Sequence, residues 1–269
     1  MRKGIWVVLW FGLLAEGLAE GPCDAQRSRQ RIEGQWRLLQ PGLKTWEDIA
    51  PGSQPLAVYS VDPKKYQIEV RDMRSSLRVG QRSNVPFFSL SEVAELHPTA
   101  VILSSAGYTK SMTRPIPVGL LKHGKREMSA LATKDSVLSG IFCVETDGGV
   151  SIFESPGTNA ERGKCVEAVQ AGPMLIRKGT VRPQGSTERY FRSFVAVDRE
   201  GNSLIGYSSR PLALTEVACM LQGSPYEAVN ALNLQGDLLG SLIVQSVGEK
   251  RKLGGVDETI ASYLVVRAR

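Results

Sequence analysis

The chain has 269 residues, of which 42% are apolar, and a formal net charge of +6. A chain of this length and composition can bury a substantial core, which excludes intrinsic disorder as its overall state. Its basic residues are mostly scattered, and the two dense clusters, at 27–31 and 122–126, contain no interleaved aromatic residues. We therefore expect no nucleic-acid partner, and at most a mild attraction for anionic molecules.

The first nineteen residues resemble a secretory signal. Arg2 and Lys3 precede an apolar run at 4–14, and small residues follow as far as Ala19. The run is shorter than the roughly 20 apolar residues that a membrane-spanning helix needs, and no other apolar run in the sequence reaches that length. We predict a signal peptide at 1–19, a leader and N-terminal segment at 20–54, and one domain at 55–269. The protein should be exported to the periplasm or the extracellular space and be soluble after signal cleavage, with no transmembrane segment.

The first half of the chain contains several short predicted elements. Pro41-Gly42 marks a turn between two tryptophan-bearing segments, and residues 55–70 contain two runs rich in β-branched and aromatic residues. Asp62-Pro63 separates these runs, which predicts successive strands or a hairpin. Residues 91–96 have helical apolar spacing and end at His97-Pro98, which predicts a short helix. A buried strand is predicted over 100–107.

Strands dominate the second half as well. Hairpins are predicted around 147–149 and 200–202, where glycine-bearing turns join alternating segments. A helix is predicted over 215–221, followed by strands at 228–234, 240–244 and 263–266. The predicted fold class is therefore α+β: a single domain with a large mixed or antiparallel sheet and a few short helices.

Export would permit disulfides among Cys23, Cys143, Cys165 and Cys219, although the sequence does not determine how they pair. A bond between Cys143 and Cys165 is preferred, because it would close a short loop over a predicted turn. Cys219 lies within a predicted helix and is interpreted as a buried free thiol. The chain has two histidines and no zinc-ligand spacing, so we predict neither a metal nor a cofactor.

The common catalytic signatures are absent. The sequence contains no Walker loop, no GxGxxG and no GxSxG, so nucleotide binding and α/β-hydrolase chemistry lose their support. Asp147 and Asp198 sit beside glycines in predicted turns and are interpreted as turn residues. Asp237 follows a buried strand in "ALNLQGDLLGSL", where it belongs either to a turn or to a site.

Five blocks together resemble the phosphodiester glycosidase domain family, and their order and spacing agree from about residue 55 to 266. The most specific is Gln170-Ala-Gly-Pro173, and the others span 104–124, 192–202, 214–221 and 231–242. The resemblance implies hydrolysis of a sugar 1-phosphodiester at a glycine-rich site where strands end.

The resemblance also implies the site residues. Arg192 and Asp237 would be catalytic, with Arg192 binding the phosphate and Asp237 supplying the remaining carboxylate. The implied substrate-binding residues are Ser105, Gly107, Gln170, Gly172, Asn233, Gln235 and Gly236.

The sequence departs from the family pattern in three places, at four residues in all. Ser105 stands where the family has asparagine, Thr109 where it has an aromatic residue, and Gln235-Gly236-Asp237 replaces Asp-Gly-Gly. A glutamine amide cannot take up a proton as a carboxylate can.

Three hypotheses remain open at this point. The first is an exported hydrolase that acts on a sugar 1-phosphodiester. The second is a catalytically inactive family member that binds an envelope glycan or anionic polymer. The third is an exported protein whose basic surface mediates protein contacts.

Overall fold

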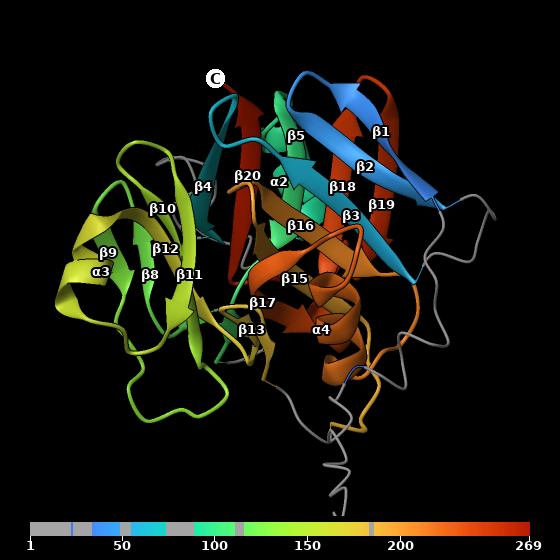
Figure 1. The fold of residues 1–269 in the computed structure, drawn as a ribbon. Helices are drawn as coiled ribbons and strands as arrows, with labels where there is room; N and C mark the ends of the chain where they lie inside the picture. Colours follow the sequence, from blue (N-terminus) through green and yellow to red (C-terminus); the bar gives the residue numbers. More distant parts are fainter. Residues whose placement is uncertain (1–22, 24–33, 49–54, 74–88, 111–115, 183–185) are drawn as a thin grey trace, which may run out of the picture.

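The computed structural model describes residues 23, 34–48, 55–73, 89–110, 116–182 and 186–269. The predicted signal peptide and most of the predicted leader therefore lie outside the described residues. Within them, short helices accompany three main sheets whose strand pairs are antiparallel (Figure 1). This agrees with the predicted fold class. No helix in the described part of the chain is both long enough and apolar enough to cross a membrane.

The largest sheet has eight strands and is covered on one face by helix α4 (Leu214–Gln222). In spatial order its strands are β1 (Gly34–Gln40), β2 (Leu43–Asp48), β3 (Leu56–Val61), β16 (Ser203–Ser208), β15 (Arg192–Asp198), β17 (Ala228–Gly236), β13 (Met174–Arg177) and β14 (Thr180–Val181). Val217 and Leu221 of α4 are fully buried against this face, as their helical spacing requires.

A five-stranded sheet packs against the opposite face of the eight-stranded one. Its strands, in order, are β19 (Glu249–Gly254), β18 (Ser241–Ser246), β5 (Ala100–Ser105), β20 (Ser262–Ala268) and β4 (Tyr66–Asp72). Helix α2 (Leu90–Leu96) covers its outer face through Leu90 and Val93, and Ser89 caps the helix through a capping box. The layers therefore run from α4 through the two sheets to α2.

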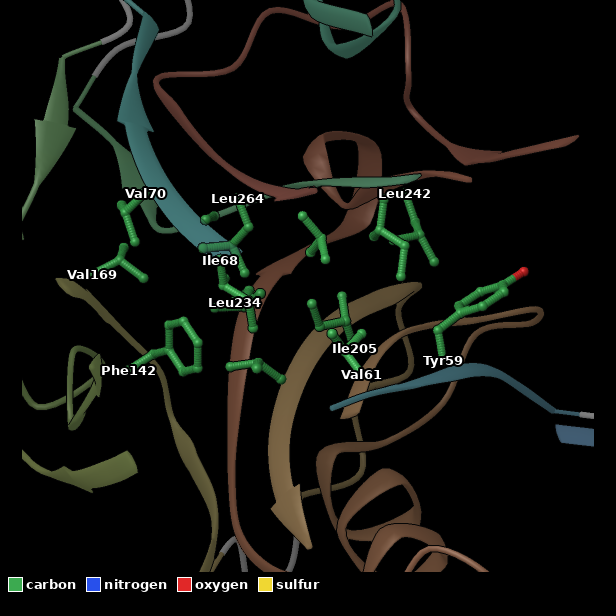
Figure 2. Close-up of a cluster of buried hydrophobic side chains, with 14 of the residues drawn as sticks. Tyr59, Val61, Ile68, Val70, Phe142, Val169, Ile205, Leu234, Leu242 and Leu264 are labelled. Carbon is green, nitrogen blue, oxygen red and sulfur yellow. The ribbon is translucent and has the colours of Figure 1, made fainter. Parts of the chain in front are cut away.

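The main core lies between these two sheets (Figure 2). Tyr59, Ile205 and Leu234 come from the eight-stranded sheet, while Leu242 and Leu264 come from the five-stranded one. All five side chains are fully buried, with 0% of their surface exposed. Burial of this kind contributes about 1.5–3 kcal/mol for each large apolar side chain, so this layer holds the two sheets together.

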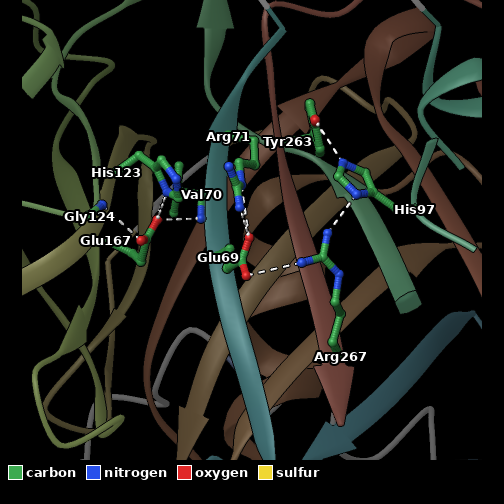
Figure 3. Close-up of polar contacts among 9 residues, drawn as sticks. All are labelled: Glu69, Val70, Arg71, His97, His123, Gly124, Glu167, Tyr263 and Arg267. Atoms are coloured by element: carbon green, nitrogen blue, oxygen red, sulfur yellow. Dashed lines mark hydrogen bonds and ion pairs between the residues drawn. The ribbon is translucent and has the colours of Figure 1, made fainter. Parts of the chain in front are cut away.

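A third sheet forms a separate group beside them, drawn in yellow-green in Figure 1. Its strands are β11 (Val150–Glu154), β10 (Gly140–Glu145), β12 (Cys165–Ala171), β8 (Leu121–His123) and β9 (Arg126–Ser129), with helix α3 (Asn159–Lys164) at its side. Glu167 of β12 attaches it to β4 by accepting the Val70 N–H at 2.8 Å (Figure 3). A two-stranded ladder of β6 (Tyr108–Thr109) and β7 (Pro117–Val118) completes the fold.

Both predicted hairpins are confirmed: β10 pairs with β11 across 147–149, and β15 pairs with β16 across 200–202. The two strands of 55–70 do not form a hairpin, because β3 joins the eight-stranded sheet and β4 the five-stranded one.

The preferred Cys143–Cys165 disulfide is also confirmed. The prediction of a free thiol at Cys219 is wrong, because Cys219 on α4 is bonded to Cys23. The reason is tertiary: 196 residues of sequence separate the two cysteines, so no local pattern could reveal the pair.

Candidate active site at the strand ends

The segment Gln235-Gly236-Asp237 is the crossing from one sheet to the other. Strand β17 ends at Gly236, a 3-10 turn follows at Asp237–Leu239, and β18 begins at Ser241 in the five-stranded sheet. Gln235 is 5% exposed, whereas Asp237 is exposed and has a positive φ of 53°. Strand alternation therefore ends before Asp237, and does not by itself bring its carboxylate to the side of Gln235.

Arg192 begins β15 directly opposite Gly236. The residue is 8% exposed, and its guanidinium lies 4.9 Å from the centre of the Tyr190 ring. Its nitrogens contact two backbone carbonyls, those of Leu212 at 3.5 Å and Glu188 at 3.4 Å.

No carboxylate of a described residue forms an ion pair with Arg192. Burial lowers the pKa of Arg192, while the nearby Tyr108, Tyr190, Glu188 and Asp237 act in the opposite direction. A guanidinium nevertheless stays protonated in proteins, and a desolvated positive charge is costly without a counter-ion. The site is thus electrostatically suited to an anion.

Tyr108 lies at the centre of a small polar cluster. Its hydroxyl donates to the Gly172 carbonyl at 2.5 Å, and the Asn233 Nδ2 donates to the Tyr108 oxygen at 3.1 Å and to Gly172 O at 2.9 Å. Burial raises the pKa of Tyr108, so its phenol is neutral at pH 7. These bonds bring together the end of β17, the residue after β12, and β6.

Three buried acceptor atoms in this region have no hydrogen-bond partner: Asn233 Oδ1, Gln235 Oε1 and Ser241 Oγ. Buried polar atoms are normally paired, and each unpaired one costs about 1–3 kcal/mol. These three atoms lie at strand ends and lack hydrogen-bond donors. A ligand with O–H or N–H groups that bound there would supply such donors.

Ser105 and Gly107 help to position the strand ends. The Ser105 Oγ accepts the N–H of Ser241 at 2.9 Å, so this hydroxyl fixes the start of β18. Gly107, with φ of +73°, makes the turn after β5, and a Cβ there would lie 3.0 Å from a methyl of Val169. The turn thereby places Tyr108 over the end of β12.

The side chain of Gln170 is fully occupied by protein groups. Its Oε1 accepts the N–H groups of Leu120 and Ala132, both at 2.9 Å. Its Nε2 contacts the carbonyls of Ala132 and Leu138 and the hydroxyl of Ser155 at 2.6–3.0 Å. The amide therefore holds surrounding loops in place instead of facing open space.

The structure thus brings together Arg192, Gly236 and Asp237, and separately Gly172 and Asn233, which both bond to Tyr108 near Arg192. Sequence reasoning did not identify Tyr108 or Ser241. Tyr108 directly follows Gly107 in the first family block, which could have singled it out, whereas no sequence signal distinguishes Ser241.

Within the described ranges, no three His, Cys, Asp or Glu side chains are grouped so as to hold a metal ion.

Solved structures with similar folds include the following three. A hypothetical protein from Synechocystis matches with a TM-score of 0.63 and 15% identity, covering 88% of this chain and 64% of that one. The catalytic domain of zebrafish N-acetylglucosamine-1-phosphodiester alpha-N-acetylglucosaminidase matches with a TM-score of 0.61 and 14% identity over 90% of both chains. A presumed exported protein from Burkholderia pseudomallei has a TM-score of 0.57 and 11% identity, over 84% of this chain and 74% of that one.

At these identities the likeness establishes the fold alone, and this chain spans less than two thirds of the Synechocystis protein. The sequence matches no curated protein. Residues 98–267, more than half of the chain, match the sequence profile of a family described as phosphodiester glycosidase. This match includes every block that carries the candidate site. The chain belongs to the phosphodiester glycosidase family.

Proposed function

We propose that the protein is a hydrolase that cleaves a sugar 1-phosphodiester into the free sugar and a phosphomonoester. The observation that carries the proposal is the buried guanidinium of Arg192, which has no ion pair with a described residue and lies in the same region as three unpaired acceptors. A sugar phosphodiester offers the matching groups: an anionic phosphate for Arg192 and hydroxyl donors for Asn233, Gln235 and Ser241.

The proposed roles follow from the chemistry of the bond that breaks. Cleavage between the anomeric carbon and oxygen releases a phosphomonoester, whose second pKa is about 6, so it leaves as an anion with little need for a proton donor. Arg192 would stabilise the charge on that leaving group. Asp237, close enough to interact electrostatically with Arg192, would activate the attacking water as a general base. One carboxylate can therefore suffice, although Gln235 replaces the family's aspartate.

Ser105, Gly107, Gln170, Gly172 and Gly236 have supporting roles in this proposal. Ser105 and Gln170 fix the strand ends and loops around the substrate, as their hydrogen bonds suggest. Gly236 leaves room beside Arg192, because a Cβ there would lie 3.1 Å from Nη1.

We also propose that this hydrolase acts outside the cytoplasm, in the periplasm or the extracellular space. Two disulfides among the described residues are consistent with an oxidising compartment. Residues 1–19 have the pattern of a cleavable signal.

The test is phosphomonoester release from a panel of sugar 1-phosphodiesters that includes N-acetylglucosamine 1-phosphodiesters. We expect Arg192→Ala to lower kcat/KM by about 100-fold or more, because it removes the charge that binds the phosphate. Asp237→Asn should lower kcat by about 10²–10⁴-fold. Arg210→Ala, at an exposed position beyond β16, is the control and should keep the full rate. Full rates in both Arg192→Ala and Asp237→Asn would refute the assigned roles.

A second candidate function is binding of the same ligand without turnover. The observation that favours it is the amide at Gln235, whose carbonyl is buried and unpaired where the family has a carboxylate. Gln235→Asp separates the two functions. Turnover by this variant but not by the natural chain would identify a binding protein built on a glycosidase fold, whereas turnover by the natural chain would refute that alternative.

A further inference from the structure

A pocket lies at the end of the eight-stranded sheet that is away from the candidate active site. It has a volume of about 140 Å³ and is formed by the β1–β2 ribbon, the turn after β15 and the loop before β17. Strand β15 runs from Arg192, at the candidate active site, to Asp198, at this pocket. At about 3.4 Å for each residue, the two places are roughly 20 Å apart along the strand.

One wall of this pocket is a cluster of aromatic rings. Trp36 and Trp46 are direct partners across the β1–β2 ribbon, with ring centres 5.5 Å apart in an edge-to-face arrangement. Tyr226 packs edge-on against both, at 6.0 and 6.3 Å. Trp46 and Tyr226 are buried, whereas Trp36 is half-buried and lines the pocket. The cluster therefore presents one rigidly supported indole to the pocket.

Most of the other lining residues are polar, and several of them carry exposed charged side chains. Lys44, Arg199 and Glu227 line the pocket and are exposed to solvent, and within the described part of the chain their side chains make no ion pair or hydrogen bond. Asp198 makes its turn rigid by accepting the N–H groups of Glu200 at 2.9 Å and Asn202 at 2.8 Å. The pocket thus holds free donors and a free acceptor around the indole.

Glu227 has an unusual backbone for its residue type. Its φ is +47°, in the left-handed region that glycine adopts readily and a glutamate adopts at a cost. Strained residues of this kind gather at binding sites, where the side chain has a use that offsets the strain. Here the strained backbone carries a carboxylate that lines the pocket and has no protein partner among the described residues.

We propose that this pocket binds one sugar ring of a glycan, independently of the candidate active site. A sugar ring has an apolar face that packs on an indole and hydroxyl groups that both donate and accept hydrogen bonds. Trp36 supplies the ring, Glu227 accepts from a hydroxyl, and Lys44 and Arg199 donate to others.

The experiment measures tryptophan fluorescence of the mature chain. The sequence has four tryptophans, and removal of the predicted signal peptide takes away Trp6 and Trp10, which leaves Trp36 and Trp46, both in the ring cluster. The probes are the methyl glycosides of N-acetylglucosamine, glucose, galactose and mannose. We expect a saturable change with at least one of them, and a Kd roughly tenfold or more higher in Glu227→Gly.

Glu227→Gly is chosen because glycine accepts the backbone conformation at this position, so the fold should be retained and Tm should not fall. Tyr190→Ala, at the candidate active site, is the control and should leave the fluorescence response unchanged. The proposal is overturned by the absence of a saturable response to all four glycosides. It is overturned equally by a response that Glu227→Gly does not weaken, or that Tyr190→Ala abolishes.

Discussion

Two glutamines near the candidate site use the same amide group in opposite ways. Gln170 is fully buried, and both ends of its side chain are bonded to protein groups from several loops. Gln235 is also buried, but its Oε1 has no partner. At the scale of single residues, we therefore expect Gln170 to determine stability and Gln235 to determine ligand binding.

This difference predicts the stability of two matched variants. Gln170→Ala should lower the free energy of unfolding by about 3 kcal/mol or more, because it leaves the N–H groups of Leu120 and Ala132 buried without acceptors. Gln235→Ala should change it by no more than about 1 kcal/mol, because it removes an acceptor that bonds to nothing. Urea unfolding measures both, with the exposed Gln67→Ala as control. Similar losses in the two variants would contradict this division of roles.

The sequence could identify many of the residues at the strand ends, but not what each side chain contacts. The family blocks singled out Arg192, Gln170 and Asn233 by type and order. The contacts of Gln170 come from residues 15 to 50 positions away, so they depend on loops whose course the sequence does not reveal. The same holds for Arg192, whose lack of an ion pair to the described residues is a property of the folded chain.

Among the elements, helix α2 is joined to the five-stranded sheet by a histidine at its end. His97 lies after α2, where its Nδ1 is 2.6 Å from Arg267 Nη2 and its Nε2 is 3.1 Å from the Tyr263 hydroxyl, both on β20 (Figure 3). Glu69 on β4 pairs with Arg267 at 3.1 Å and with Arg71 at 2.5 Å. The neutral imidazole can accept from Arg267, whereas a protonated one cannot.

This contact predicts that acid weakens the docking of α2. Burial lowers the pKa of His97, and the positive charges of Arg267 and Arg71 add to the effect, against Glu69. A histidine with a lowered pKa in the folded state binds its proton more readily when unfolded. Its stabilising contribution is therefore complete above the ordinary pKa of about 6.5 and is lost as pH falls through the lower folded value.

The measurement is Tm from pH 8 to pH 5 for the natural chain and for His97→Gln, whose amide does not titrate. We expect Tm of the natural chain to fall below about pH 6.5, and to fall less in His97→Gln. Equal pH profiles for the two proteins would show that His97 has no part in the dependence.

Strands and turns that depend on neighbouring residues could be predicted from the sequence, whereas the way in which the strands assemble into sheets could not. The turns at 147–149 and 200–202 join strands that pair with each other, so short-range signals sufficed for both hairpins. Strands β3 and β4 follow each other along the chain but enter different sheets, because their apolar faces pack on opposite sides of the main core. Such a choice depends on long-range packing, which no window of sequence contains.

At the scale of the whole molecule, the two disulfides tie very different lengths of chain. Cys143–Cys165 joins β10 to β12 within one sheet, across a separation of 22 residues. Cys23–Cys219 joins a buried residue near the N-terminus to helix α4, across 196 residues. The second bond thus links the start of the chain to the layer that covers the eight-stranded sheet.

The loop lengths predict unequal contributions to stability. In the chain-entropy account, closing a loop restricts the unfolded chain more as the loop lengthens, which gives about 3 kcal/mol for the short loop and about 5 kcal/mol for the long one. Cys23→Ala/Cys219→Ala should therefore lower the free energy of unfolding more than Cys143→Ala/Cys165→Ala. Denaturant unfolding of the two double variants measures this, and peptide mapping without reductant verifies the remaining bond in each. A greater loss on removing the short-loop bond would instead mean that native packing around β10 and β12, and not loop length, decides what each disulfide contributes.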